Sequence, residues 1–537
     1  MAVGRLCAQS ALLNQFFPIL FLCLPFTASL PFSSAFASSS PAFTSCQSAH
    51  TNGLGDIGSR MAAEEQAYSF GCAFCGGCHW FDEHIDSYGN YLVTLGPLGA
   101  NCGGPNAGYS AVLCTAAPKK DSGEPSCPNR IGNPINAGTS NKYQIETDFE
   151  VYNLNFARMY NSKPSSIGTS FGKGWQHSFE RQLWLLQLPN QKIWVTRPTG
   201  VTQLFTRSGS RWLPDHDIAD SLEQLTDVSG NTTGWQYVVG SDSSIETYSA
   251  SGRLLSIADR SGRTQTLAYD LPVASGGDDD PDTLDAVVDD AGRTLRFTYD
   301  AQKRIATVVD PAGGVIAYGY DPVGNLVSVT YPDGHAKTYH YNEPAHTGGA
   351  DLPHALTGIT DENGDRFATY AYDASGRAVS TAHAGGADSH TLSYGPAATT
   401  VTDPLGTQRV YGFTTVLGVV KSTGVSQPGG SGCGAASSSV AYDANGNVAA
   451  RTDFNGHTTC YAYDLTRNLE TAGLEGPAQG IACPADLAAH TPAPNSAERT
   501  ILTRWHATFR LPTKVTEAGR ETTTVYDSRG NVVSRTV

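Results

Sequence analysis

The stretch Leu295–Gly324, LRFTYDAQKRIATVVDPAGGVIAYGYDPVG, decides how this chain folds. It holds a short run that ends in Tyr-Asp, a turn, a second run, the turn Asp310-Pro-Ala-Gly313, and a third run that again ends in Tyr-Asp. In Leu295–Tyr299 the apolar residues fall at every second position, which is the period of a β-strand. The stretch therefore predicts short strands joined into hairpins.

The unit recurs at a fixed spacing. Tyr299, Tyr320 and Tyr341 are 21 residues apart, and so are Tyr442 and Tyr463. A period of about 20–50 residues indicates a repeat architecture. One hairpin cannot bury its apolar face alone, whereas stacked copies can. The second half of the chain is therefore predicted to be an array of stacked hairpins.

The D-x-x-G signals and the repeated tyrosines have structural explanations. The Asp side chain can accept a backbone N–H bond two residues on, Pro presets φ, and Gly supplies a positive φ, often with a bulge. Tyrosines that recur with a strand period are typical of a packed core. We assign these structural roles to Tyr269, Asp270, Tyr299, Asp300, Asp310, Gly313, Tyr320, Asp321, Gly324, Tyr372, Asp373, Gly376, Tyr442, Asp443, Gly446, Tyr463, Asp464, Tyr526, Asp527 and Gly530.

Three stretches carry a family resemblance. YDASGRAVS at Tyr372–Ser380, YDANGNVAARTDFNGHTTCYAYD at Tyr442–Asp464 and YDSRGNVVSRTV at Tyr526–Val537 resemble RHS (YD) repeats. The resemblance covers residues 236–537. It implies a mainly β fold in which repeated hairpins spiral into a partial shell, preceded by a small β domain and a Cys-rich irregular N-terminal region.

Residues 132–235 resemble the uncharacterised domain that precedes RHS repeats in bacterial proteins, here called the leading domain. The motifs of that family run T-G-N-K, R-x-Y-N-S, F-G-x-G-W and R-P-x-G. This chain has Thr139-Ser-Asn-Lys142, Arg158-Met-Tyr-Asn-Ser162, Phe171-Gly-Lys-Gly-Trp175 and Arg197-Pro-Thr-Gly200, with Ser140 in place of the first glycine. Alternation at Gln191–Thr196 favours a sandwich-like β meander. The resemblance carries no known chemistry with it.

Residues 1–37 are predicted to be a secretory signal. Phe16–Leu30 is apolar, and Ala35-Phe-Ala37 fits an A-x-A cleavage site. A transmembrane helix is the alternative, but the run is short and carries two prolines. A lipoprotein anchored at Cys46 is a further alternative, although that cysteine is far from the apolar run. We expect an exported protein, either secreted or at the cell surface, with the periplasm also open, and no membrane segment after cleavage.

Residues 38–131 are rich in Cys and Gly, and ten cysteines follow the signal. An even number of cysteines in an exported chain predicts disulfides, with a connectivity that the sequence does not give. The candidates are Cys46, Cys72, Cys75, Cys78, Cys102, Cys114, Cys127, Cys433, Cys460 and Cys483.

One cysteine group also has the spacing of a cofactor site. Cys75-Gly-Gly-Cys78-His79 is C-x-x-C-H, the attachment motif of c-type haem, in which the His would bind the iron. Cys72 adds a third cysteine at the same spacing, and no helix-forming sequence surrounds the motif. Disulfides are therefore favoured over haem, with structural zinc as the third alternative. No cofactor is expected.

Two further motifs are explained without chemistry. Gly168-Thr-Ser170-Phe-Gly172 matches G-x-S-x-G, but a nucleophile elbow must open a helix, and here Lys-Gly-Trp follows. A tight glycine loop explains it better. Gly277–Asp282 is acidic but lacks the spacing of a calcium loop. The histidines show no catalytic spacing, so we expect no catalytic residues, no metal and no enzyme activity.

Composition agrees with a turn-rich β protein. The chain has 537 residues, 57 glycines and only 16% charged residues, enough length for two or three domains. Its net charge of −15 argues against nucleic acid and anionic membrane surfaces as partners.

The resemblance implies a function. Shells of this family encase or present a toxic C-terminal domain in competition between cells, so this chain is expected to be a secreted structural scaffold without its toxin. Its partner would be a C-terminal or separate toxin polypeptide. The alternative is an extracellular carbohydrate-binding or adhesion protein, whose exposed Tyr and Trp would contact cell-surface glycans. If the tyrosines are buried, that alternative loses its main support.

Overall fold

The computed structural model describes residues 78–85, 91–97, 113–115, 120–163, 170–186, 191–269, 283–430, 434–477 and 482–537. The chain divides into two compact units, 1–117 with 429–435, and 118–428 with 436–537. In the first unit, β1 (Cys78–Ile85), β2 (Tyr91–Pro97) and β3 (Leu113–Thr115) form an antiparallel sheet. The region expected to be irregular thus contains three strands.

The second unit starts with a short inner segment, which we define as residues 120–163 and 170–181. A 3-10 turn η2 (Cys127–Asn129) precedes the paired strands β4 (Arg130–Ile131) and β5 (Ile135–Asn136). A three-stranded antiparallel sheet follows: β6 (Tyr143–Val151), β7 (Leu154–Asn161) and β8 (Trp175–His177). Nearly every residue of β7 is buried, so both faces of this strand are covered and it lies in the middle of a core.

The rest of the unit consists of two antiparallel sheets in which each strand pairs with the next along the chain. The long sheet contains β9 (Gln182–Leu186), β10 (Lys192–Thr196), β11 (Thr202–Ser208), β12 (Arg211–Pro214), β13 (Ser221–Thr226), β14 (Thr232–Val238), β15 (Ile245–Ser249), β16 (Leu254–Ala258), β17 (Thr264–Ala268), β18 (Ala286–Asp289), β19 (Thr294–Tyr299), β20 (Ile305–Val309), β21 (Val315–Tyr320), β22 (Leu326–Thr330), β23 (Ala336–Tyr341), β24 (Leu356–Thr360), β25 (Arg366–Tyr372), β26 (Ala378–His383), β27 (His390–Tyr394), β28 (Ala398–Thr402), β29 (Gln408–Val416), β30 (Val419–Gln427) and β31 (Ala436–Ser437). The second sheet contains β32 (Ser439–Tyr442), β33 (Val448–Thr452), β34 (Thr458–Asp464), β35 (Leu469–Glu475), β36 (Arg499–Trp505), β37 (Pro512–Glu517), β38 (Arg520–Tyr526) and β39 (Val532–Thr536). Two further 3-10 turns, η4 (Pro344–His346) and η5 (Ala384–Gly386), lie in loops.

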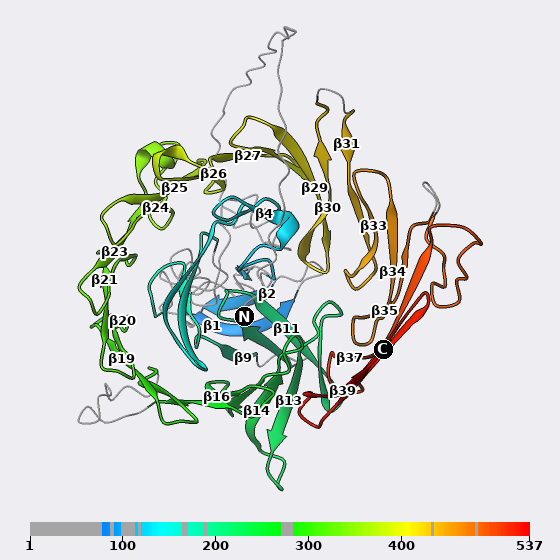
Figure 1. The fold of residues 1–537 in the computed structure, drawn as a ribbon. Coiled ribbons are helices and arrows are strands. Elements are labelled where there is room, and N and C mark those ends of the chain that lie inside the picture. Colours follow the sequence, from blue (N-terminus) through cyan, green and yellow to red (C-terminus); the bar gives the residue numbers. More distant parts are fainter. Residues whose placement is uncertain are drawn as a thin grey trace. The chain divides into compact units, whose positions relative to one another are not determined.

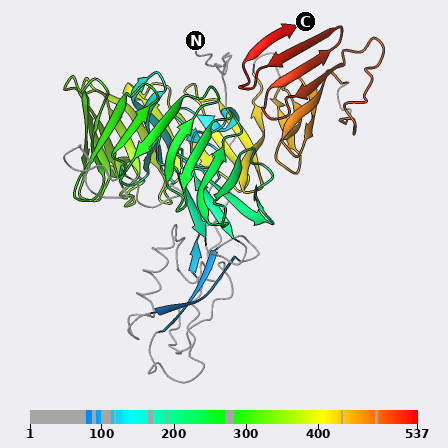
Figure 2. The ribbon, with the colours of Figure 1, turned by 90° about the horizontal axis from the view of Figure 1, so that it is seen from below.

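The long sheet winds around the inner segment, whose strands are cyan in Figure 1. Figure 2 shows the same band of strands from the side, with β32–β39 as a separate sheet in orange and red. The N–H of Leu183 in β9 donates to the carbonyl of Gly252 at 2.9 Å, so the first strand returns to the turn before β16. Among the described strands no pairing joins β31 to β9, and the sheet is not closed into a barrel. The predicted fold class, a mainly β spiral of hairpins, is confirmed.

The hairpin turns are built by their aspartates. Asp310 Oδ1 accepts the backbone N–H groups of Ala312 at 2.7 Å and Gly314 at 2.9 Å, and Gly313 between them has φ +88°. A side chain at Gly313 would be strained by this φ, which explains the glycine. The same carboxylate-to-amide pattern occurs at Asp300, Asp321, Asp373, Asp443 and Asp527.

A tyrosine at the end of most hairpins, usually that of a Tyr-Asp pair, joins neighbouring hairpins. In most repeats the register shifts at this residue, as between Gly319 and Tyr320, which marks a β-bulge. The hydroxyl then donates to a backbone carbonyl in the preceding hairpin, as Tyr320 does to Ile305 at 2.7 Å. We call this series the tyrosine ladder. Its other members are Tyr269 to Leu254, Tyr299 to Leu284, Tyr341 to Leu326, Tyr372 to Leu356, Tyr394 to Ala378, Tyr442 to Ser422 and Tyr526 to Pro512.

A single core lies between the long sheet and the inner segment. The ring of Phe156 lies 5.4 Å from that of Phe297, and Trp175 lies 5.2 Å from Tyr339 in edge-to-face geometry. These contacts join β7 and β8 to β19 and β23. Strands β9–β13, which fall inside residues 132–235, and β14, which crosses position 235, belong to the long sheet, so position 235 does not coincide with a sheet boundary. Alternating strands look alike in sequence whichever sheet they enter.

Candidate functional site within the wound sheet

The inner segment is bonded to repeats that are far apart in the sequence. Ser140 accepts the N–H of Ala378 at 3.1 Å, and Ser170 accepts that of Ile305 at 2.8 Å. Gly172 approaches the turn at Gly324 so closely that a Cβ there would lie 2.1 Å from its carbonyl oxygen. The inner segment is therefore fixed against the shell on several sides.

A buried ion pair lies at the centre of this contact. Arg158 in β7 donates from Nε to Asp148 Oδ2 at 2.5 Å and from Nη2 to Oδ1 at 2.8 Å, and both side chains are 0% exposed. The repeats supply the remaining partners: Tyr318 donates to Asp148 at 2.9 Å, and the Tyr339 hydroxyl accepts from Arg158 at 3.1 Å. Burial acts to lower the pKa of Arg158, but Asp148 outweighs it and raises the pKa.

Aromatic rings surround the Arg158–Asp148 pair. The guanidinium of Arg158 lies 5.2 Å from the ring centre of Trp175 and 5.5 Å from that of Tyr339, within the range of cation–π attraction. Trp175 Nε1 donates to the Tyr341 hydroxyl at 2.8 Å. A charged pair of the inner segment is thus enclosed by the tyrosines of β21 and β23.

The four motifs of the leading domain meet at Asn161. Its Oδ1 accepts from Asn141 at 2.8 Å, and its Nδ2 donates to the carbonyl of Thr199 at 2.9 Å. Gly174, from the third motif, packs so that a Cβ would lie 3.0 Å from the carbonyl oxygen of Asn161. The motifs therefore describe one hydrogen-bonded junction and not separate sites.

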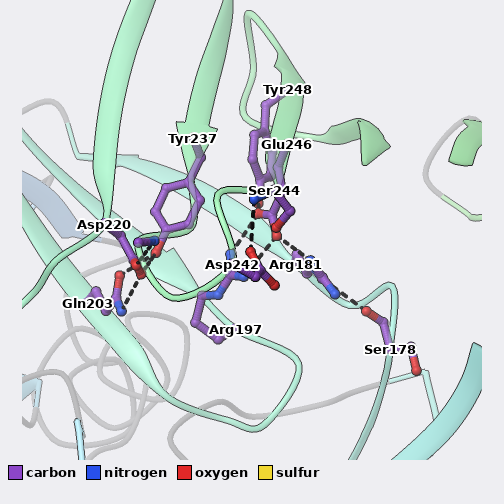
Figure 3. A network of polar contacts seen from close by, with 11 residues as sticks. Ser178, Arg181, Arg197, Gln203, Asp220, Tyr237, Asp242, Ser244, Glu246 and Tyr248 are labelled. Carbon is purple, nitrogen blue, oxygen red and sulfur yellow. Dashed lines mark hydrogen bonds and ion pairs between the residues drawn. The ribbon is translucent and has the colours of Figure 1, made fainter. Parts of the chain in front are cut away.

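A second charged network links the inner segment to the first repeats (Figure 3). Glu246 in β15 is 0% exposed and accepts from Arg197 Nη1 at 2.6 Å and Nη2 at 2.8 Å; Arg181 also pairs with it, and Tyr248 donates to it at 2.6 Å. Burial acts to raise the pKa of Glu246, but the two arginines outweigh it and lower the pKa to about 2. Tyr237, stacked 4.7 Å from Arg197, continues this network into β14.

The G-x-S-x-G serine lies in a group that superficially resembles a catalytic triad. Ser170 Oγ donates to Glu180 Oε2 at 3.4 Å, and His177 Nε2 lies 3.9 Å from the same oxygen. A triad needs the histidine between the serine and the carboxylate, whereas here the carboxylate lies between them. Burial lowers the pKa of His177 to about 3 and raises that of Glu180 to about 8. The arrangement does not activate Ser170 as a nucleophile.

The structure pairs two of the candidate cysteines. Cys460 in β34 and Cys483 form a disulfide, which holds the loop after β35 against a small core with Leu474 and Leu487. Cys127 is also disulfide-bonded. Of the haem motif, Cys78 and His79 begin β1, while Cys75 lies outside the described residues. Asp270, Cys433 and the acidic loop at 277–282 also lie outside them.

The described residues contain neither a metal-binding cluster nor a membrane-spanning helix. No group of three or more His, Cys, Asp or Glu in the described ranges could hold a metal ion. None of the helical turns in this part of the chain is long and apolar enough to cross a membrane.

Four repeat tyrosines of the long sheet face inward. Tyr318, Tyr339, Tyr370 and Tyr372 are buried in the core. They are therefore not available to stack on sugars, and the glycan-binding alternative loses the support that exposed repeat tyrosines would have given it.

Sequence reasoning missed the carboxylates that complete the charged networks. Asp148 and Glu246 stand in unremarkable strands, and their partners come from other elements. A signal existed on the other side of each pair, because Arg158 and Arg197 belong to the quoted motifs of the leading domain. A buried arginine needs a carboxylate.

Comparison with protein families agrees with this architecture. Residues 132–205 match the family described as a domain of unknown function, DUF6531. Residues 286–315 and 301–336 match the RHS Repeat family. The fold is therefore that of a hairpin-repeat shell with a preceding domain. The chain thus contains RHS repeats, and the leading domain comes before them.

Comparison with individual proteins adds little. No curated protein matches the chain. Among solved structures, the chain is similar to TcdB2-TccC3-Cdc42, with 12% identity, a TM-score of 0.34 and coverage of 64% of this chain and 20% of that one. A Tc holotoxin pore of Photorhabdus luminescens gives 11% identity, a TM-score of 0.32 and coverage of 66% and 22%. The chain thus spans about a fifth of the length of these proteins, and such low scores carry no argument about its chemistry.

Proposed function

We propose that the chain is a structural shell segment of an exported toxin-delivery protein, in which the inner segment closes part of the shell's interior. The observation that carries the proposal is the buried Arg158–Asp148 pair enclosed by Tyr318 and Tyr339. The hydroxyls of Tyr318 and Tyr339 fix the inner segment to the repeats, because moving the two apart would leave the buried ions without these hydrogen bonds. The role is mechanical, and we propose that the chain has no catalytic activity.

The second sheet supports a role in contacting a partner polypeptide. Strands β32–β39 have only a small core of their own, and every residue of β39 is exposed. An open antiparallel edge can take up a further strand. We propose a toxin polypeptide, either C-terminal or separate, as the partner enclosed on this side.

Export is part of the proposal. The apolar run at 16–30 with its A-x-A site supports a signal peptide, and the Cys460–Cys483 disulfide suits an oxidising compartment. The intact mass of the secreted protein, before and after reduction and alkylation, checks both. Loss of residues 1–37 and mass gains from alkylation only after reduction are expected. A haem-sized adduct, or cysteines that alkylate freely, would contradict this assignment.

A competition assay tests the toxin-delivery function. The reading frame is deleted in the bacterium that encodes it, and survival of a co-cultured competitor is measured. We expect the deletion strain to inhibit the competitor less, with recovery by the wild-type gene and by Val228→Ala, a change at a fully exposed residue. Arg158→Ala should not restore inhibition. Undiminished inhibition by the deletion strain would reject the function.

A further inference from the structure

One tyrosine of the repeats departs from the tyrosine ladder. Tyr463 occupies the Tyr-Asp position at the end of β34, where the register shifts as in the other repeats. Its hydroxyl nevertheless makes no hydrogen bond to any residue that the structure describes, whereas Tyr442 and Tyr526 on either side donate to Ser422 at 2.6 Å and Pro512 at 2.9 Å. A half-buried hydroxyl without a partner is unusual in a repeat whose other members are satisfied.

This tyrosine lines a cavity of about 500 Å³ on the second sheet. Three directly opposed pairs form its floor: Tyr463 with Glu470, Thr503 with Val515, and Trp505 with Pro512. Opposed residues on adjacent strands present their side chains side by side. The remaining lining residues are Ser241, Asn468, Leu469 and Arg510. The volume lies in the range of small-ligand sites, about 300–1,000 Å³.

The carboxylate of Glu470 is the second polar group without a partner. Within the described part of the chain it makes no hydrogen bond or ion pair, and burial alone raises its pKa. Its backbone carbonyl, in contrast, accepts from Trp505 Nε1 at 2.7 Å, which fixes the indole ring beside the carboxylate. The cavity therefore presents an immobilised aromatic ring flanked by free hydrogen-bonding groups.

Arg510 supplies a positive charge that forms no ion pair with the described residues, although the more distant Asp220 acts to raise its pKa. Its Nη2 donates to the carbonyl of Asn468 at 2.7 Å, and its Nη1 donates to that of Arg467. Burial and Arg467 lower its pKa, and among the described residues no carboxylate lies within ion-pair distance. These two bonds use only two of the five guanidinium hydrogens. The others are available to an anion.

We propose that this cavity binds a sugar acid, a monosaccharide unit that carries hydroxyls and a carboxylate. The apolar face of the sugar ring would stack on Trp505, its hydroxyls would donate to Glu470 and accept from Tyr463, and its carboxylate would pair with Arg510. A bare anion would not use Glu470, and a neutral sugar would not use Arg510. This inference does not rest on the proposed delivery function and would stand if that function failed.

The test is calorimetric titration of the whole protein with D-glucuronate, glucose and acetate. We expect glucuronate to bind, and to bind at least about tenfold more tightly than glucose or acetate, because each of these lacks one half of the recognised groups. A glucuronate-containing disaccharide, run in parallel, distinguishes a site for free monosaccharide from one for a glycan chain. Equal affinity for glucuronate and acetate, or no heat from glucuronate, would overturn the proposal.

Two variants with a matched control locate the binding. Tyr463→Phe removes a hydroxyl that the fold does not use, and should weaken glucuronate binding about two- to tenfold without changing the urea midpoint. Tyr442→Phe, the control, removes a ladder hydroxyl whose partner, Ser422, does not line the cavity, and should lower the midpoint without changing binding. Glu470→Gln should weaken binding about tenfold. Unchanged binding in both cavity variants, or a loss of stability in Tyr463→Phe equal to that in Tyr442→Phe, would overturn the assignment.

Discussion

Replacing Asp148 by Asn should lower the free energy of unfolding by about 3–5 kcal/mol. The substitution keeps the shape of the side chain but removes the charge that faces Arg158. Both side chains are 0% exposed, so no water can replace the lost partner. Arg158 cannot relieve the penalty by losing its proton, because arginine stays charged in proteins. Its Nη1 already lacks a hydrogen-bond partner, so the site has no spare acceptor.

The assay is urea unfolding followed by tryptophan fluorescence. The ring of Trp175 lies 5.2 Å from the Arg158 guanidinium, so its emission reports on this junction. Asp259→Asn is the matched control, since Asp259 pairs with Arg263 on the surface with side chains 35% and 59% exposed. The same substitution there should cost less than about 1 kcal/mol.

A double variant separates the charge from the packing. Asp148→Leu with Arg158→Met replaces the pair by apolar side chains and should recover a large part of the loss, since apolar replacements of buried pairs are often neutral. Recovery will be incomplete because the hydroxyls of Tyr318 and Tyr339 lose their partners. The reasoning would be refuted if Asp148→Asn cost no more than Asp259→Asn, which would mean that water reaches the pair.

The other predictions concern single positions. Ser140→Gly should raise the free energy of unfolding by about 1 kcal/mol, because Ser140 has φ +59°, a conformation that costs L-residues about 1–2 kcal/mol; a lower urea midpoint would contradict this. The folded pKa of Glu246, about 2, lies below its ordinary 4.5, so its stabilisation is complete above pH 4.5 and about 3 kcal/mol should be lost as the pH falls to 2. Glu246→Gln should abolish that part of the pH dependence. If the free energies of unfolding of the variant and the wild type changed in parallel with pH, Glu246 would not be its source. The pKa shift of Glu180 has the opposite sign, because burial raises its folded pKa to about 8. Its favourable contribution to the free energy of unfolding is therefore lost as the pH rises from 4.5 to 8. The Glu180 side chain is 25% exposed, so solvent reduces the effect. At pH 8 the free energy of unfolding of Glu180→Gln should be higher than that of the wild type by only about 1–2 kcal/mol, and at pH 4 the two should be equal. Reduction of Cys460–Cys483, which are 23 residues apart, should cost about 3 kcal/mol locally, and protease should then cut within 482–498 first; uniform cleavage would argue against a local effect.

Local chemistry explains how much the sequence could predict. The turn at Asp310–Gly313 is determined by residues within five positions, so its spacing suffices to predict a hairpin. Strand alternation likewise predicts β structure from neighbours alone. The sequence shows that Ser140 replaces the glycine of the first family motif. Only the backbone conformation shows the consequence, which is a positive φ at a residue that carries a side chain.

The candidate sites depended on distances that no local pattern contains. Asp148 and Tyr318 are 170 residues apart, and no spacing rule joins an acidic residue of one strand to a tyrosine of another repeat. The cavity at Tyr463 was hidden for a different reason. Its sequence looks like every other Tyr-Asp unit, and only the missing ladder bond distinguishes it.

The same long separations have a consequence for folding. The inner segment is synthesised before the repeats, yet its partners lie far downstream: Arg158 contacts Tyr339 181 residues later, and Ala137 accepts from Thr399 262 residues later. Contacts of this range form slowly, because the chain loses loop entropy before it gains packing. A buried guanidinium cannot be accommodated until its tyrosine enclosure exists. The inner segment should therefore reach its final state only when β21–β23 have formed, so the repeats fold around the segment that fills them.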